Sequence, residues 1–69
     1  MQFYLYDAVI IKEGVRDSDS GLDLSGMSGR ISNIGYRNDG WPITVDVTLE
    51  GGVAEYCFSA EELILVEDK

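Results

Sequence analysis

A strict alternation of apolar and polar residues in ITVDVTL, residues 43–49, constrains the fold more than any other feature of the chain. This period of two, carried largely by β-branched residues, is typical of a β-strand with one buried face. The Glu50-Gly51-Gly52 segment that follows offers two glycines that adopt positive φ readily, as a tight hairpin turn requires. Residues 53–59 alternate again and are predicted to return as the partner strand. The side chains expected to face inward are Ile43, Val45, Val47, Leu49, Ala54, Tyr56 and Phe58.

An earlier strand is predicted at residues 7–12, with Val9 and Ile11 as its inward pair. It is followed by a long acidic loop at residues 17–28. Two leucines interrupt this polar loop, and we expect at least Leu24 to fold back into the core.

The next strand is predicted at residues 29–36, where the alternation is imperfect. Its apolar residues Ile31 and Ile34 are three positions apart instead of two. A β-bulge near Ser32 and Asn33 would restore the register. A turn is then expected at residues 37–42, with Asp39-Gly40 at its tip.

The end of the chain carries a helix-start pattern. Ser59 is a potential N-cap, and Glu62 stands three residues later, as in a capping box. Only a single 3₁₀ or α turn fits before a last strand at residues 64–67.

Taken together, these elements predict an all-β, five-stranded, SH3-like barrel with one short helical turn before the last strand. Residues 1–69 would form a single domain, because a chain this short has only one small core. Closure of the barrel would remove the exposed sheet edges that otherwise promote aggregation. The alternative is an open β-meander with the same local pairings.

The residue types present exclude several classes of chemistry. The chain has no histidine and one cysteine, so it offers neither a histidine-activated nucleophile nor an ordinary zinc site. Cys57 shares its strand face with Glu55, whose charge disfavours a thiolate, and an inert thiol is expected. We therefore predict a protein that is not an enzyme and holds no cofactor.

Charge and hydropathy indicate the kind of partner. Thirteen acidic and five basic residues give a net charge of −8, which disfavours nucleic acid and anionic membranes. Another protein, with a basic or uncharged contact surface, is the expected partner. The sequence shows neither a membrane-spanning apolar run nor a signal peptide, and a cytoplasmic location is expected.

The DSDSG segment at the start of the acidic loop has three readings. A calcium site would use Asp17, Asp19 and Asp23, but the spacing lacks the glycine and glutamate of an EF-hand loop. Alternatively, Asp17 and Asp19 form an acidic lip that binds lysine or arginine of a partner. The third reading is a solvated loop without function.

Aromatic and apolar residues near the N-terminus are the other candidate contacts. A small barrel cannot easily enclose Phe3, Tyr4, Tyr6 and Ile10 together, so we expect an exposed strip that binds a partner. An additional N-terminal strand that covers these side chains is the alternative. Trp41 is either an interface anchor or a cap on one end of the core.

Three segments of the chain carry a resemblance to a known family. They are DLSGMSGRI (residues 23–31), PITVDV (residues 42–47) and YCFSAEELILV (residues 56–66), and they resemble the variable chain of ferredoxin-thioredoxin reductase. The matching positions are Asp23, Leu24, Gly26, Met27, Gly29, Pro42, Ile43, Phe58, Glu61, Glu62 and Leu63.

The resemblance implies an SH3-like barrel that acts as a non-catalytic, stabilising subunit. In that family the iron-sulfur cluster and the redox cysteines belong to the partner chain, so an iron-sulfur redox subunit is the implied partner. Gly-x-x-Gly before a strand also occurs in KOW-type barrels, which leaves a nucleic-acid-binding domain as an alternative. Independently of any family, Gly26 and Gly29 are expected to be architectural, and Met27 to fill the core.

Overall fold

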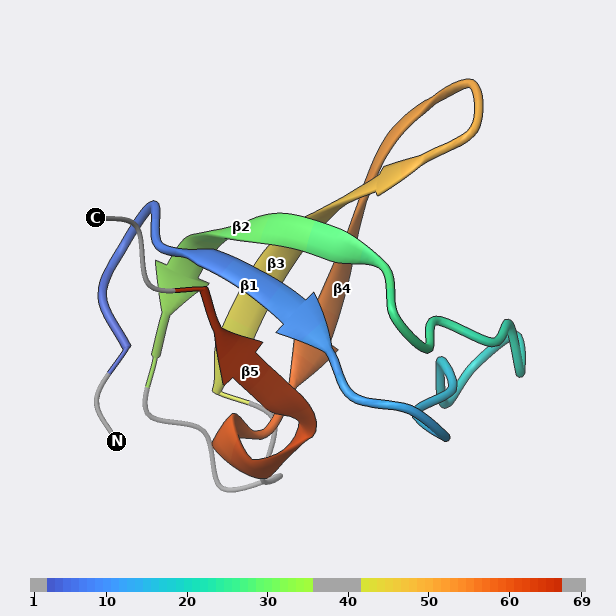
Figure 1. Cartoon of the computed structure of the whole chain (residues 1–69), viewed down its shortest axis with the longest axis horizontal. Coiled ribbons are helices and arrows are strands. Elements are labelled where there is room, and N and C mark those ends of the chain that lie inside the picture. The colour runs from blue at the N-terminus through green and yellow to red at the C-terminus, as the bar shows by residue number, and fades with distance from the viewer. Residues whose placement is uncertain (1–2, 36–41, 67–69) are drawn as a thin grey trace.

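The computed structural model describes residues 3–35 and 42–66, which form an all-β fold with one 3₁₀ helix (Figure 1). The predicted all-β class is therefore confirmed. In chain order the elements are β1 (Ala8–Ile11), β2 (Ser28–Ile34), β3 (Ile43–Leu49), β4 (Gly52–Phe58), η1 (Ala60–Glu62) and β5 (Leu63–Leu65).

The strands form one antiparallel sheet in the order β4-β3-β2-β1-β5. The first four strands make a meander, and β5 returns to the free side of β1. Within residues 3–35 and 42–66, β4 and β5 have one partner strand each and form the two edges. The sheet is thus open, as in the meander alternative, and the closure expected of a barrel is not observed. Closure would need pairing between β4 and β5, but β5 is three residues long and pairs with β1.

One face of the sheet is apolar and encloses the core. Its nine buried side chains come from all five strands and from the acidic loop, so the sheet is curled around them. They are Val9, Ile11, Leu24, Ile31, Ile43, Val45, Val47, Phe58 and Leu63. Val9, Ile11, Ile43, Val45, Val47 and Phe58 are buried as the alternation predicts, whereas Leu49, Ala54 and Tyr56 of the predicted rows are half-buried. Met27 is half-buried and packs against this cluster, as expected of a core filler.

The β3–β4 hairpin follows its alternation without interruption. Its register is continuous over seven pairs, from Ile43↔Phe58 to Leu49↔Gly52, and Glu50 and Gly51 form the connecting turn. Gly51 has a φ of 92°, which confirms the need for glycine there.

The bulge predicted in the second strand is confirmed. The β2–β3 register shifts between Ile31, which pairs with Val45, and Asn33, which pairs with Thr44. Ser32 is the extra residue, and its hydroxyl donates a hydrogen bond to the Thr44 carbonyl at 3.4 Å. The predicted turn at residues 37–42 lies largely outside the described residues.

Gly29 is architectural, as expected. A Cβ at this position would collide with the backbone carbonyl oxygen of Asp46 and lie 2.7 Å from Cγ1 of Val45. Only a residue without a side chain allows β2 to lie this close to β3. Gly26 also has an architectural role, because its φ of 74° favours glycine.

The helical turn forms where the capping pattern predicts it. The Ser59 backbone N–H donates to Oε1 of Glu62 at 3.0 Å, and the Glu62 N–H donates to the Ser59 carbonyl at 3.1 Å. η1 ends where β5 begins at Leu63, one residue before the predicted start of the last strand.

Candidate partner-binding surface

The N-terminal aromatic residues form a tight turn instead of a strand. The Asp7 backbone N–H donates to the Tyr4 carbonyl at 3.2 Å, and the Tyr4 N–H donates to the Asp7 carboxylate at 2.9 Å. Tyr6 is tied to β2, because its N–H donates to the Ile31 carbonyl at 2.8 Å and its carbonyl accepts from the Arg30 guanidinium at 3.1 Å. These bonds hold the turn in one conformation.

Tyr6 adopts an uncommon backbone conformation in this turn. Its φ of 69° lies in the left-handed region, which is unfavourable for a bulky residue, and its side chain is 72% exposed. The turn also exposes Tyr4 and Leu5. Strained backbone that presents a side chain to solvent occurs preferentially at functional sites.

The N-terminal turn adjoins an apolar part of the outer sheet face. Ile10 on β1 lies directly opposite Ile64 on β5, and both are exposed. Val66, also exposed, is joined to β1 by its N–H, which donates to the Ala8 carbonyl at 3.0 Å. We call the exposed apolar residues of the turn and of this sheet region the docking face: Tyr4, Leu5, Tyr6, Ile10, Ile64 and Val66.

A shallow groove of about 560 Å³ crosses the outer face beside these residues. Ala8, Ile10 and Val66 line it on the β1 side, and Thr48 and Val53 line it on the hairpin side. The small residues of β2, Ser28 and Gly29, together with Arg30 and Asp46, complete its lining. The groove is open and mainly apolar, with one residue of each charge, which suits contact with a protein surface.

The acidic loop is a folded structure at the other end of β1. Arg16 and Asp23 form a β-bridge, the Asp17 N–H donates to the Leu22 carbonyl, and Leu24 is completely buried. Leu24 thus anchors the loop as predicted, whereas Leu22 is exposed. Figure 1 shows this loop and the N-terminal turn at opposite sides of the molecule, so the two predicted contact regions are not brought together.

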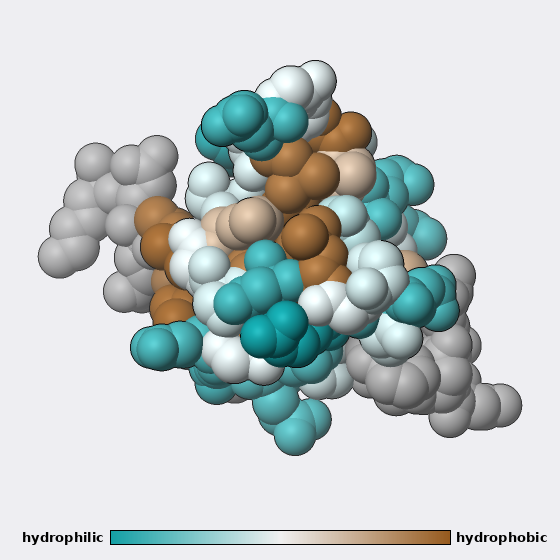
Figure 2. Space-filling model, turned by 90° about the vertical axis from the view of Figure 1, so that its right-hand side faces the viewer, coloured by the Kyte–Doolittle hydropathy of each residue, from teal (hydrophilic) through white to brown (hydrophobic). Residues whose placement is uncertain are grey.

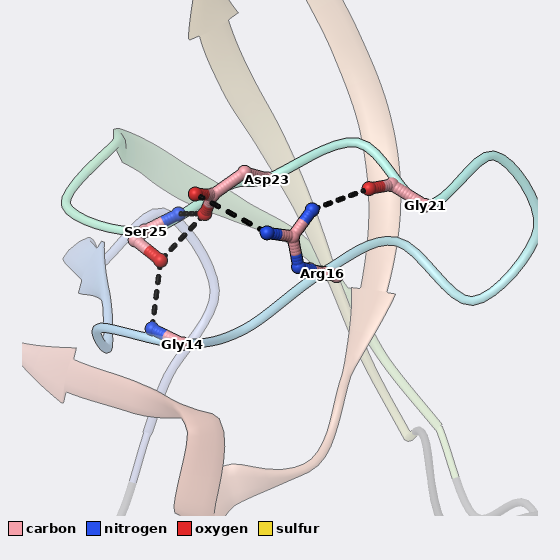
Figure 3. A network of polar contacts seen from close by, with 5 residues as sticks. All are labelled: Gly14, Arg16, Gly21, Asp23 and Ser25. Carbon is pink, nitrogen blue, oxygen red and sulfur yellow. Dashed lines mark hydrogen bonds and ion pairs between the residues drawn. The ribbon is translucent and has the colours of Figure 1, made fainter.

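A polar network organises the neck of the loop (Figure 3). The Ser25 hydroxyl donates to the Asp23 carboxylate at 2.6 Å and accepts from the Gly14 N–H at 2.7 Å. The Arg16 guanidinium donates to the Gly21 carbonyl at 3.1 Å and lies 4.0 Å from the Asp23 carboxylate. Both side chains of this ion pair are exposed, so it contributes little to stability.

The hydrogen bonds stabilise the ionised form of two loop carboxylates. The Ser25 hydroxyl and N–H lower the pKa of Asp23, with a smaller contribution from Arg16. The Ser20 hydroxyl and N–H lower the pKa of Asp17 in the same way. These carboxylates therefore bind their own loop, in the manner of Asx turns.

The structure gives no support to the hypothesis of a calcium site at Asp17, Asp19 and Asp23. Asp17 and Asp23 are engaged by Ser20 and Ser25, and Asp19 is exposed. Among residues 3–35 and 42–66, no three acidic or cysteine side chains are placed to hold a metal ion together. Cys57 is an exposed free thiol with its sulfur 3.7 Å from the Thr44 hydroxyl. No helix in the described part of the chain is long and apolar enough to span a bilayer.

Comparisons with known proteins indicate neither a family nor a function for this chain. No family model, no curated protein and no solved structure matches the chain.

The predicted contact residues have different surroundings in the structure. Tyr4, Tyr6 and Ile10 are exposed, but Phe3 is half-buried and packs against the core, so it does not belong to the exposed strip. Neither is there an N-terminal strand that covers these side chains, since residues 3–7 form no strand. Trp41 lies outside the described residues.

Five further apolar residues are exposed although the sequence did not indicate it: Leu5, Ile34, Val53, Ile64 and Val66. Residues 63–66 are all apolar, so the sequence does not show which of them face solvent. The pairing of β5 with β1 decides this, and it joins segments near the two ends of the sequence. The continuous apolar run does indicate an exposed patch, because a strand with apolar residues on both faces leaves one of its two faces in solvent when it lies at a sheet edge.

On the side that carries the acidic loop, the surface has a different character. Figure 2 shows hydrophilic surface over much of this side, with a column of apolar surface running down from the end of the β3–β4 hairpin. Leu49 at this end of the hairpin packs against the core, and Val53 on β4 is exposed.

Proposed function

We propose that this protein is a non-catalytic interaction domain, an accessory subunit or adaptor, that binds another protein chain through the docking face. The observation that carries the proposal is Tyr6, whose exposed aromatic ring is presented by a turn in an unfavourable conformation. An exposed ring adds little to the core, so folding alone does not account for a tyrosine at a backbone position that is unfavourable for it.

The composition of the docking face supports a protein partner. Tyrosine is among the residues that contribute most to binding energy when it is buried in an interface, and Tyr4 and Tyr6 both lie on this face. Ile10, Ile64 and Val66 extend it with apolar area and no charge. The net charge of −8 works against a nucleic acid, so the KOW-like alternative has less support.

We further infer that the fold is an SH3-like barrel left open between its edge strands. The strand order, the hairpin and the 3₁₀ turn before the last strand support this assignment. The resemblance to the variable chain of ferredoxin-thioredoxin reductase suggests that the partner is an iron-sulfur redox subunit. In such an assembly the cluster would belong to the partner, since one cysteine cannot hold it.

The proposal is tested with a Tyr6→Gly variant. Glycine accepts positive φ, so the variant should fold at least as stably as the native chain, with a gain of up to about 1 kcal/mol in the free energy of unfolding. It should nevertheless lose the partner, because it removes an exposed aromatic contact. Chemical denaturation measures the first effect, and affinity purification from cells of the source organism measures the second.

Leu22→Ser is the matched control, since Leu22 is an exposed apolar residue on the opposite side of the molecule. It should retain the partner. A stoichiometric chain that stays bound in high salt, and is lost only in Tyr6→Gly, supports the docking face. A native protein that remains a solitary monomer, or that binds oligonucleotides at physiological salt, contradicts the proposal.

A further inference from the structure

The open edge of β4 is the longest unpaired strand edge among the described residues. β4 has seven residues, contains no proline, and pairs with β3 without a bulge. Proteins usually protect such edges with short strands, prolines, bulges or charges. β5 follows that rule by being short, whereas β4 has only Glu55 for protection.

The hairpin register fixes which backbone groups of β4 are free. Leu49 and Gly52 flank a two-residue turn, so they form a hydrogen-bonded pair, and the bonding alternates from there along the strand. Every second residue of β4 therefore bonds to β3. The residues between them direct their N–H and C=O groups to the open edge: Val53, Glu55 and Cys57.

A row of charged side chains crosses the outer face and ends at this edge with an acidic residue that has no basic neighbour in the row. Arg30 on β2 lies opposite Asp46 on β3, and Asp46 lies opposite Glu55 on β4. Opposite charges in register stabilise a sheet, but the like pair Asp46 and Glu55 is unfavourable. A cation on the far side of Glu55 would compensate for this repulsion.

We propose that the β4 edge binds an extended segment of another protein as an added antiparallel strand, with lysine or arginine opposite Glu55. The three free backbone positions would provide the hydrogen-bonding ladder, and the charge row would select the basic side chain. A second copy of this chain is a poor occupant, because each copy carries a net charge of −8. This edge shares no residue with the docking face, so the inference does not depend on the function proposed above.

The probe is the capped peptide Ser-Thr-Val-Thr-Lys-Thr-Val-Thr-Ser, in which lysine and both valines share one face of a strand. Amide NMR spectra of the labelled protein report its binding. The amides of Val53, Glu55 and Cys57 should exchange more slowly with solvent, whereas those of Ala54, Tyr56 and Phe58, which already bond to β3, should change little. Only strand addition produces this alternation.

Two control peptides separate the backbone contribution from the charge contribution. Replacing lysine by glutamate should weaken binding about three- to tenfold, the effect of exchanging a favourable cross-strand charge pair for an unfavourable one. Replacing both valines by proline keeps the charge but removes the N–H groups that would bond to β4, and should abolish the protection pattern.

Glu55→Lys should reverse the preference, so that the glutamate peptide binds more tightly. Glu13→Lys makes the same charge change in the turn after β1, which is separated from β4 by two strands, and should preserve the native preference. Tyr6→Gly should also bind the lysine peptide normally. Equal binding of the lysine and proline peptides, no protection at millimolar peptide, or self-association through β4 would overturn the proposal.

Discussion

At the scale of single residues, Gly29 sets the distance between two strands of the sheet. Its backbone conformation is open to other amino acids, so the requirement for glycine comes from space alone. The space is occupied by backbone and by a buried valine, neither of which moves without disturbing the core. A methyl group at this position must push β2 away from β3.

Gly29→Ala should therefore lower the free energy of unfolding by about 1–3 kcal/mol, the usual cost of overpacking a core. Gly35→Ala is the matched control, because a Cβ at Gly35 would have no neighbour within 4 Å. The control should change stability by less than about 1 kcal/mol. Urea denaturation of both variants makes the comparison. Equal stability of the two would show that β2 and β3 are less tightly packed than described.

At the scale of elements, the acidic loop is maintained by hydrogen bonds from serine to aspartate at two separate places. Ser25 acts on Asp23 at the neck, and Ser20 acts on Asp17 near the tip. Each serine lowers the pKa of its own aspartate, so each bond can be removed independently.

Ser25→Ala should raise the pKa of Asp23 towards the ordinary value of 3.8 and leave that of Asp17 unchanged. Ser20→Ala should have the reverse effect. Titration of the side-chain carboxyl groups by NMR measures both. If each variant shifted both pKa values equally, the two networks would not be independent.

The same shifts predict how stability depends on pH. Because the folded-state pKa of Asp23 lies below its ordinary value, the ionised carboxylate stabilises the folded state above about pH 4, and this contribution disappears as the pH falls through the folded-state pKa. Ser25→Ala should therefore lose less stability on acidification than the native protein.

At the scale of the whole molecule, excess negative charge opposes folding. The chain has thirteen acidic and only five basic residues, and the unbalanced negative charges repel one another more strongly in the compact state than in the extended chain. The midpoint of thermal unfolding should rise as sodium chloride increases from about 10 mM to about 150 mM, because the Debye length falls over this range from about 30 Å to about 8 Å. A midpoint that fell with salt would mean that favourable ion pairs dominate.

The sequence predicts those parts of the fold that depend on the pattern of residues close together in the chain. The alternation in residues 43–49 requires a strand, and the spacing of Ile31 and Ile34 requires an irregularity at Ser32. The burial of Leu24 follows in the same way, from an apolar residue in a polar loop.

The remaining features depend on contacts between distant parts of the sequence. Ile64 is exposed because β5 pairs with β1, which is more than fifty residues away in the chain. Tyr6 adopts positive φ because its N–H donates to the Ile31 carbonyl and its carbonyl accepts from Arg30, and tyrosine has no local preference for that conformation. The docking face depends on the β1–β5 pairing and on the hydrogen bonds that hold Tyr6, so its extent could not be predicted from the sequence.

The pairing of β1 with β5 also has a consequence for synthesis. β1 leaves the ribosome before the other four strands of this sheet, yet the strand that covers its second side is the last of the five to emerge. Until then β1 has an uncovered edge and the core lacks Leu63. The nascent chain therefore passes through a stage in which four strands of the sheet are available and its folding cannot be completed.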